Sequence, residues 1–199
     1  MSDLIYAEEL IPCCELESGT GLPLRLGLIG EQWVTPKLAV QAAVGVTFQS
    51  SSFTALSEVF PTTEFGDVQT EYQWDMSYTQ IMLSVGARQR LISFLSLGVD
   101  LRGLILAGRS ESLTERIVRG DGYQFFPPAQ EIVFDDLEVT QMSAFVLEPS
   151  VSLQYDIALG LGTVLSPSVN LSMPLNSLST EGSWRYLGLG VGVRLSRGL

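Results

Sequence analysis

The sequence predicts an all-β fold: a closed, antiparallel, eight-stranded transmembrane β-barrel with short periplasmic turns and long extracellular loops. Segments of about eleven residues alternate apolar and polar side chains, which is the period of a β-strand and a length that crosses a bilayer. Short and long connections between these segments alternate. The hydrophobic content is high, at 46% with a mean hydropathy of +0.27, yet no apolar run is long enough for a transmembrane helix.

Length and charge narrow the classes of protein. The 199 residues suffice for one barrel-sized domain spanning residues 1–199, with residues 1–20 as an N-terminal strand and loop. The net charge of −11 argues against nucleic acid as a partner, because nucleic acid attracts basic surfaces. A soluble β-sandwich is the alternative fold, since its strands also alternate apolar and polar residues.

The clearest strand runs from Leu38 to Phe48, where even positions are apolar and odd positions are small or polar. In the segment Tyr72–Arg88 the apolar positions change parity, which predicts a β-bulge near Thr79 or Gln80. The remaining predicted strands are Leu22–Gln32, Phe94–Leu106, Phe145–Tyr155, Thr163–Met173 and Arg185–Leu195.

The connections sort by length onto two sides of the predicted sheet. The short ones are Val34–Lys37, Ala87–Ser93 and Asp156–Gly162, the long ones are Ser50–Thr70 and Gly108–Asp136, and Leu175–Ser183 is intermediate. These seven strands begin on the long-loop side and end on the short-turn side. Closing an antiparallel barrel therefore requires an eighth strand before Leu22, and Leu4–Ile11 is the candidate, followed by a loop over Cys13–Gly21.

Charge is also sorted between the two faces of the predicted strands. The apolar faces carry no charged residue near mid-strand, where a basic side chain in lipid would cost about 2–4 kcal/mol. Six charged residues on the polar faces form a predicted network inside the barrel: Arg25, Glu31, Asp100, Arg102, Glu148 and Arg194. We expect them to be paired or hydrated and to fill the narrow interior; a gated ion or proton path is the alternative.

Aromatic residues lie near the ends of the predicted strands, which favours two interfacial girdles. The girdle residues are Trp33, Phe48, Trp74, Tyr78, Phe94, Phe145, Tyr155, Trp184 and Tyr186. A further aromatic group in the second long loop, Tyr123, Phe125 and Phe126, is a candidate contact site for a partner. The alternative is that this group folds back onto the rim.

Enzyme chemistry finds no support in the residue types. The chain has no histidine, so neither a Ser-His-Asp triad nor a Cys-His pair can form, and a zinc site is not expected. We assign no catalytic residue, no metal and no cofactor. The adjacent Cys13 and Cys14 bridge each other only with strain, which leaves lipid attachment, intermolecular pairing or simple burial.

Three segments carry a resemblance to a known family: the turn Thr35-Pro36-Lys37, the final strand Gly188–Leu195, and Cys13–Gly21 ahead of the first clear strand. The chain resembles small outer-membrane β-barrel domains of Gram-negative envelopes, of the OmpA/OmpX or PorT-like, Bacteroidetes–Chlorobi type. The resemblance implies a bacterial outer-membrane location, with outer-membrane lipid, lipopolysaccharide and other envelope proteins as partners. Met1-Ser2-Asp3 does not resemble a secretory leader, so we expect that a leader has been removed.

The function expected from the sequence is structural: a non-enzymatic barrel that anchors in the outer membrane or binds a partner through its extracellular loops. A narrow porin-like channel is one alternative, and single-channel conductance would separate the two. A soluble lipocalin-like ligand-binding barrel is another. The lipocalin-like hypothesis predicts good solubility without detergent.

Overall fold

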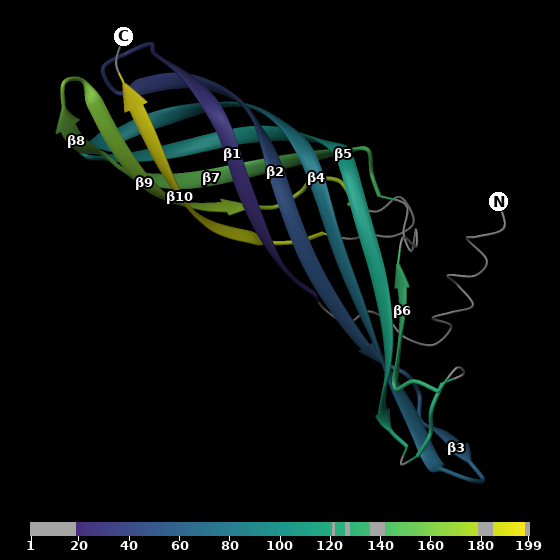
Figure 1. Cartoon of the computed structure of the whole chain (residues 1–199). Helices are drawn as coiled ribbons and strands as arrows, with labels where there is room; N and C mark the ends of the chain where they lie inside the picture. Colours follow the sequence, from purple (N-terminus) through teal and green to yellow (C-terminus); the bar gives the residue numbers. More distant parts are fainter. Residues whose placement is uncertain (1–18, 121, 126–127, 136–141, 179–184, 198–199) are drawn as a thin grey trace. The chain divides into compact units, whose positions relative to one another are not determined.

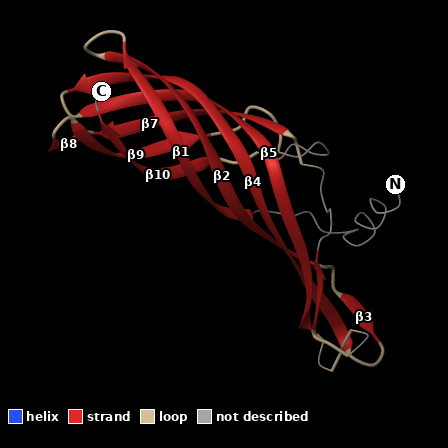
Figure 2. Cartoon of the chain, turned by 45° about the horizontal axis from the view of Figure 1, so that its top comes forward, coloured by secondary structure: helices blue, strands red, loops and turns tan. Residues whose placement is uncertain are grey.

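The structure is a computed structural model, and it describes residues 19–120, 122–125, 128–135, 142–178 and 185–197. All regular structure in these ranges is β-strand (Figure 2). Within the same ranges, no helix has the length and apolar character needed to cross a membrane. The predicted all-β, antiparallel fold is confirmed.

Within the described ranges, one sheet contains ten strands rather than the predicted eight. They are β1 (Gly19–Trp33), β2 (Leu38–Leu56), β3 (Phe60–Thr62), β4 (Gly66–Ile92), β5 (Leu95–Arg119), β6 (Glu131–Asp135), β7 (Phe145–Tyr155), β8 (Ile157–Gly160), β9 (Thr163–Ser172) and β10 (Gly188–Arg197). The main path follows the order β1-β2-β4-β5-β7-β9-β10, with the short strands β3, β6 and β8 beside β4, β5 and β9. Among the described residues this path is open, with β1 and β10 at its two ends, and the predicted strand Leu4–Ile11 lies outside the described residues.

Neighbouring strands pair antiparallel with a defined register. On β5 and β7 the pairs run from Leu95 opposite Tyr155 to Ile105 opposite Phe145. On β1 and β2 the backbones approach closely at Gly45, where a Cβ atom would lie 2.3 Å from the Leu26 carbonyl oxygen. A side chain at Gly45 would push these two strands apart, so glycine is required there.

The described chain divides into two compact units. Unit 1 comprises Met1–Leu24, Phe48–Thr79 and Gly108–Thr140, and unit 2 comprises Arg25–Thr47, Gln80–Ala107 and Gln141–Leu199. Strands β1, β2, β4 and β5 contribute residues to both units. In unit 2 the strands of the main path curl, so that one face of the sheet is inner and the other outer (Figure 1).

The apolar face of β4 changes sides where the strand passes from unit 1 to unit 2. Even-numbered side chains from Val68 to Met82 point to the protected side, and almost all of them are buried. In unit 1 these include Trp74, Met76 and Tyr78, whereas in unit 2 the exposed odd positions carry the apolar residues Ile81, Leu83 and Val85. The predicted bulge near Thr79 is therefore wrong, because the alternation continues unbroken and only the location of the apolar residues changes.

The same change explains why the long loops were predicted wrongly. The segment 50–70 contains the end of β2, all of β3 and the start of β4, and the segment 108–136 contains the end of β5 and all of β6. On β2 the exposed apolar residues of unit 2, such as Val40 and Val44, are succeeded in unit 1 by Ser50 and Thr54 on the same face. The sequence prediction recognised strands by apolar residues at every second exposed position. Where polar residues take those positions, the strand was mistaken for a loop.

Candidate functional site

The inner face of unit 2 brings charged side chains from several strands together. Its outer face is apolar, so strand alternation directs polar side chains inward. The charged contributors come from five strands and one connection: Arg25 and Glu31 from β1, Arg88 from β4, Asp100 and Arg102 from β5, Glu148 from β7, Arg194 from β10, and Asp156 after β7.

Glu148 is the centre of the first ion cluster. Its side chain is fully buried and accepts hydrogen bonds from Arg25 Nη2 at 3.0 Å and Arg102 Nη1 at 2.9 Å. Arg102 stands directly opposite Glu148 in the β5–β7 register. Tyr186 donates its hydroxyl to the same carboxylate and packs against a small apolar cluster that includes Leu104 and Val146.

Arg88 is the centre of the second ion cluster. It is buried and lies 3.2 Å from a Glu31 carboxylate oxygen, while its other terminal nitrogen contacts Asp156. Arg194 approaches Glu31 from β10 at 3.1 Å. The Ser166 hydroxyl donates to Asp156 at 2.7 Å. Two cations and two carboxylates therefore neutralise one another in this cluster.

Polar side chains extend the second cluster across the inner face. Arg194 donates to Gln154 Oε1 at 3.0 Å and to Gln41 Oε1 at 3.4 Å, and the Gln41 amide donates to Asp100. The network thus joins β10 to β1, β2, β5 and β7. Such contacts hold strands in register and fill the interior with side chains.

Trp33 and Arg90 stack at the short-turn end of unit 2. The Arg90 guanidinium carbon lies 4.3 Å from the centre of the Trp33 ring, and that of Arg88 lies 5.8 Å from it. Arg90 also donates to the Pro36 carbonyl at 3.4 Å. This cation–π stack lies next to the second ion cluster, because both contain Arg88.

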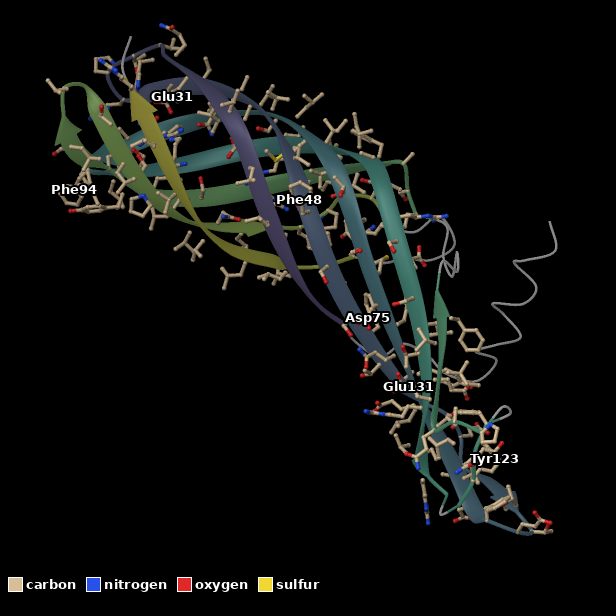
Figure 3. The ribbon with its side chains drawn as sticks, in the orientation of Figure 1. Glu31, Phe48, Asp75, Phe94, Tyr123 and Glu131 are labelled. Atoms are coloured by element: carbon tan, nitrogen blue, oxygen red, sulfur yellow. The ribbon has the colours of Figure 1, made fainter. Side chains whose placement is uncertain are left out.

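The six charged residues predicted from the sequence all lie on the inner face but do not form one network of six. Arg25, Arg102 and Glu148 meet in the first cluster, and Glu31 and Arg194 meet in the second, where Glu31 lies beside the end of β10 (Figure 3). Asp100 contacts Gln41 instead of a cation. Sequence reasoning missed Arg88, Asp156 and Tyr186 as members of these clusters. Tyr186 could have been assigned to the inner face, because it stands at an even-numbered position of the predicted strand Arg185–Leu195, as Arg194 does.

The predicted aromatic girdle separates into different environments. Phe48, Phe94, Phe145 and Tyr155 are exposed on the outer face, and Phe94 and Tyr155 pack together with ring centres 5.1 Å apart (Figure 3).

The other predicted girdle residues that the structure describes are buried or contact charged side chains. Trp74 and Tyr78 are only 1% and 3% exposed, so they cannot belong to an outward girdle. Tyr186 points to Glu148, and Trp33 stacks on Arg90. Trp184 lies outside the described residues.

The candidate contact residues lie in an aromatic cluster of unit 1. The Tyr123 ring makes edge-to-face contacts with Phe60, Phe65 and Phe125, with ring centres 5.7–6.3 Å apart (Figure 3). Phe126 lies outside the described residues. Phe65 and Tyr123 also line a shallow cleft of about 500 Å³, together with Asp67 and Arg119, which form an ion pair at 3.3 Å.

Comparison with known proteins adds no relative to this description. No protein-family model, curated protein or solved structure matches the chain. The functional argument therefore depends on the residues and contacts above.

Proposed function

We propose that the chain is a non-enzymatic outer-membrane β-barrel protein that serves as an anchor or binds a partner. In this proposal, unit 2 is closed into a barrel and lies in the bilayer. Unit 1, which exposes Ser50 and Thr54 on β2 and Ser77 on β4, meets water and supplies the surface for partners. Outer-membrane lipid, lipopolysaccharide and other envelope proteins are the proposed surroundings.

The observation that carries the proposal is the outer face of unit 2, where consecutive strands expose aliphatic side chains at every second position. Typical exposed fractions are 48% for Val40, 51% for Leu83, 54% for Val99, 46% for Leu153 and 50% for Val169. Soluble monomers rarely expose contiguous apolar patches larger than a few hundred Å². A band of such residues around a barrel is what a hydrocarbon environment requires.

The inner face supports an anchor over an open channel. The carboxylates of Glu31, Glu148 and Asp156 contact arginines, and side chains from opposite parts of the curled sheet meet within the interior. Buried charges are tolerated when they are paired. Paired charges and side chains that meet across the interior favour an anchor over an open channel.

Unit 1 supports a partner-binding role. Its cleft combines the aromatic faces of Phe65 and Tyr123 with the polar groups of Asp67, Arg119 and Gln130. A mixture of aromatic anchors and polar groups is typical of recognition surfaces.

Heat-dependent gel migration tests the membrane proposal. The chain is refolded in detergent or lipid vesicles and in buffer alone, then run boiled and unboiled on a denaturing gel. We expect faster migration of the unboiled protein only after refolding in detergent or lipid, because closed membrane barrels resist the gel detergent. Identical migration in every sample, together with cooperative folding in buffer, would favour the soluble barrel.

A further inference from the structure

Three basic residues gather at the short-turn end of unit 2, where the connections β1–β2 and β4–β5 lie. Lys37 belongs to the β1–β2 connection, Arg90 lies near the end of β4, and Arg197 ends β10 opposite Thr163, the first residue of β9. The strand β10 ends at the same end of the sheet as the β1–β2 connection (Figure 1). We call Lys37, Arg90 and Arg197 the basic rim.

The basic rim forms no ion pair with any residue that the structure describes. The carboxylates nearest to it are already neutralised, since Arg88 contacts Glu31 and Asp156, and Arg194 contacts Glu31. The rim therefore adds uncompensated positive charge to a cluster that is neutral by itself. This local excess is present although the whole chain has a net charge of −11.

Arg90 is held in place by its neighbours. Its backbone N–H donates to the Lys37 carbonyl at 2.7 Å, which places these two residues side by side. The guanidinium stacks on Trp33 at 4.3 Å and, among the described residues, has the Pro36 carbonyl as its one hydrogen-bond acceptor, at 3.4 Å. A planar guanidinium held on an aromatic face has N–H donors left for the oxygens of a phosphate group.

The apolar outer face of unit 2 reaches the basic rim. Val34 follows Trp33 directly and is 62% exposed, and Leu91 and Ile92 follow Arg90 and are 50% and 49% exposed. Aliphatic surface that gives way to tryptophan and basic side chains is typical of the level at which lipid headgroups lie. A soluble anion does not require these apolar neighbours, so they favour an anion that carries acyl chains.

We propose that the basic rim binds the phosphodiester of an anionic phospholipid headgroup, with the acyl chains against the apolar outer face. Arg90 supplies hydrogen-bond donors, and Lys37 and Arg197 supply further positive charge. The short turns of outer-membrane barrels lie on the periplasmic side, so the lipid belongs to that leaflet. The inference rests on the proposed membrane location and adds a ligand class and a binding site to it.

Lipid titration of the full chain, refolded in an uncharged detergent, tests the proposal. The probes are short-chain phosphatidylglycerol, phosphatidylcholine with the same chains but no net charge, and inorganic phosphate without chains. Native mass spectrometry gives the apparent Kd of each lipid for the parent, Lys37→Gln, Arg90→Gln and Arg90→Lys. The matched control is Arg116→Gln, which removes a cation that pairs with Glu71 in unit 1. Heat-dependent gel migration verifies that each variant is folded.

We expect the parent to bind phosphatidylglycerol more tightly than phosphatidylcholine. Lys37→Gln and Arg90→Gln should each weaken the binding of phosphatidylglycerol about fivefold, because each removes one cation near the headgroup. Arg90→Lys should keep part of the affinity, and Arg116→Gln should match the parent. Equal affinity of the parent for the two lipids, or equal Kd values for the rim variants and Arg116→Gln, would overturn the proposal. Displacement of phosphatidylglycerol by an equal concentration of inorganic phosphate would overturn the lipid as the ligand.

Failure of this inference differs from failure of the membrane proposal. Heat-dependent migration of the parent, combined with lipid binding that the rim substitutions leave unchanged, refutes the basic rim as a site and leaves the membrane location standing. Folding in buffer alone without heat-dependent migration refutes the membrane location, and with it the inference that rests on it.

Discussion

Replacing Glu148 with glutamine is expected to lower the free energy of unfolding by about 3–5 kcal/mol. The substitution leaves Arg25 and Arg102 as neighbouring cations in the interior, with side chains only 20% and 13% exposed and with no carboxylate between them. It also weakens the hydrogen bond that Tyr186 donates. Breaking one member of a buried ion cluster costs more than the cluster contributes, because the uncompensated charges stay out of water.

Equilibrium unfolding in urea, with protein refolded in the same detergent or lipid, measures this effect. Glu64→Gln is the matched control, because Glu64 is exposed in the turn before β4 and its substitution should change stability by less than about 0.5 kcal/mol. Adding Arg25→Met to Glu148→Gln should recover part of the loss. Equal stability of the Glu148→Gln and Glu64→Gln variants would contradict the assignment of Glu148 as the charge-balancing centre.

Placing arginine at Val85 is expected to destabilise the protein in lipid by about 2–4 kcal/mol. Val85 lies on the outer face of unit 2 between further apolar residues of β4 and is 62% exposed. If this face met water, a substitution at such an exposed position would change stability by less than about 0.5 kcal/mol. The size of the effect therefore reports which solvent the outer face meets.

Ser77→Arg is the matched control, since Ser77 is exposed on the same face of β4 within unit 1. Both variants are refolded into lipid vesicles, and their free energies of unfolding are compared with that of the parent chain. A large decrease in the free energy of unfolding for Val85→Arg, with a negligible decrease for Ser77→Arg, supports contact of Val85 with lipid and of Ser77 with water. Similar small effects at both positions would refute the membrane location of unit 2.

Strand positions were largely predictable from the sequence because alternation with a period of two is a local property. The predicted Phe145–Tyr155 coincides with β7, and the predicted Leu22–Gln32 lies within β1. Alternation shows which residues share a face but not which face is inner. The switch on β4 between Tyr78 and Ile81 therefore looked like a bulge, and Trp74 was placed on the wrong side.

The candidate site was predictable only as a class of residues. Charge on the polar faces correctly indicated that Arg25 and Glu148 belong to the inner face. Which cation contacts which carboxylate depends on the curl of the sheet, since Arg25 lies on β1 and Glu148 on β7, four positions along the path. Arg88 was missed because it stands at the end of its predicted strand, inside the segment Ala87–Ser93 that was predicted to be a short turn.

The unbroken alternation of β4 restricts how the strand can change length. From Val68 to Met82 the even-numbered side chains stay on the protected side. The apolar residues occupy even positions before Thr79 and odd positions after it, so the number of residues at this junction determines which residues of each part face inward. Inserting or deleting one residue there would turn Trp74 outward or Leu83 inward, whereas a change of two residues would preserve both faces. Natural variants of this segment should therefore differ in length by even numbers of residues.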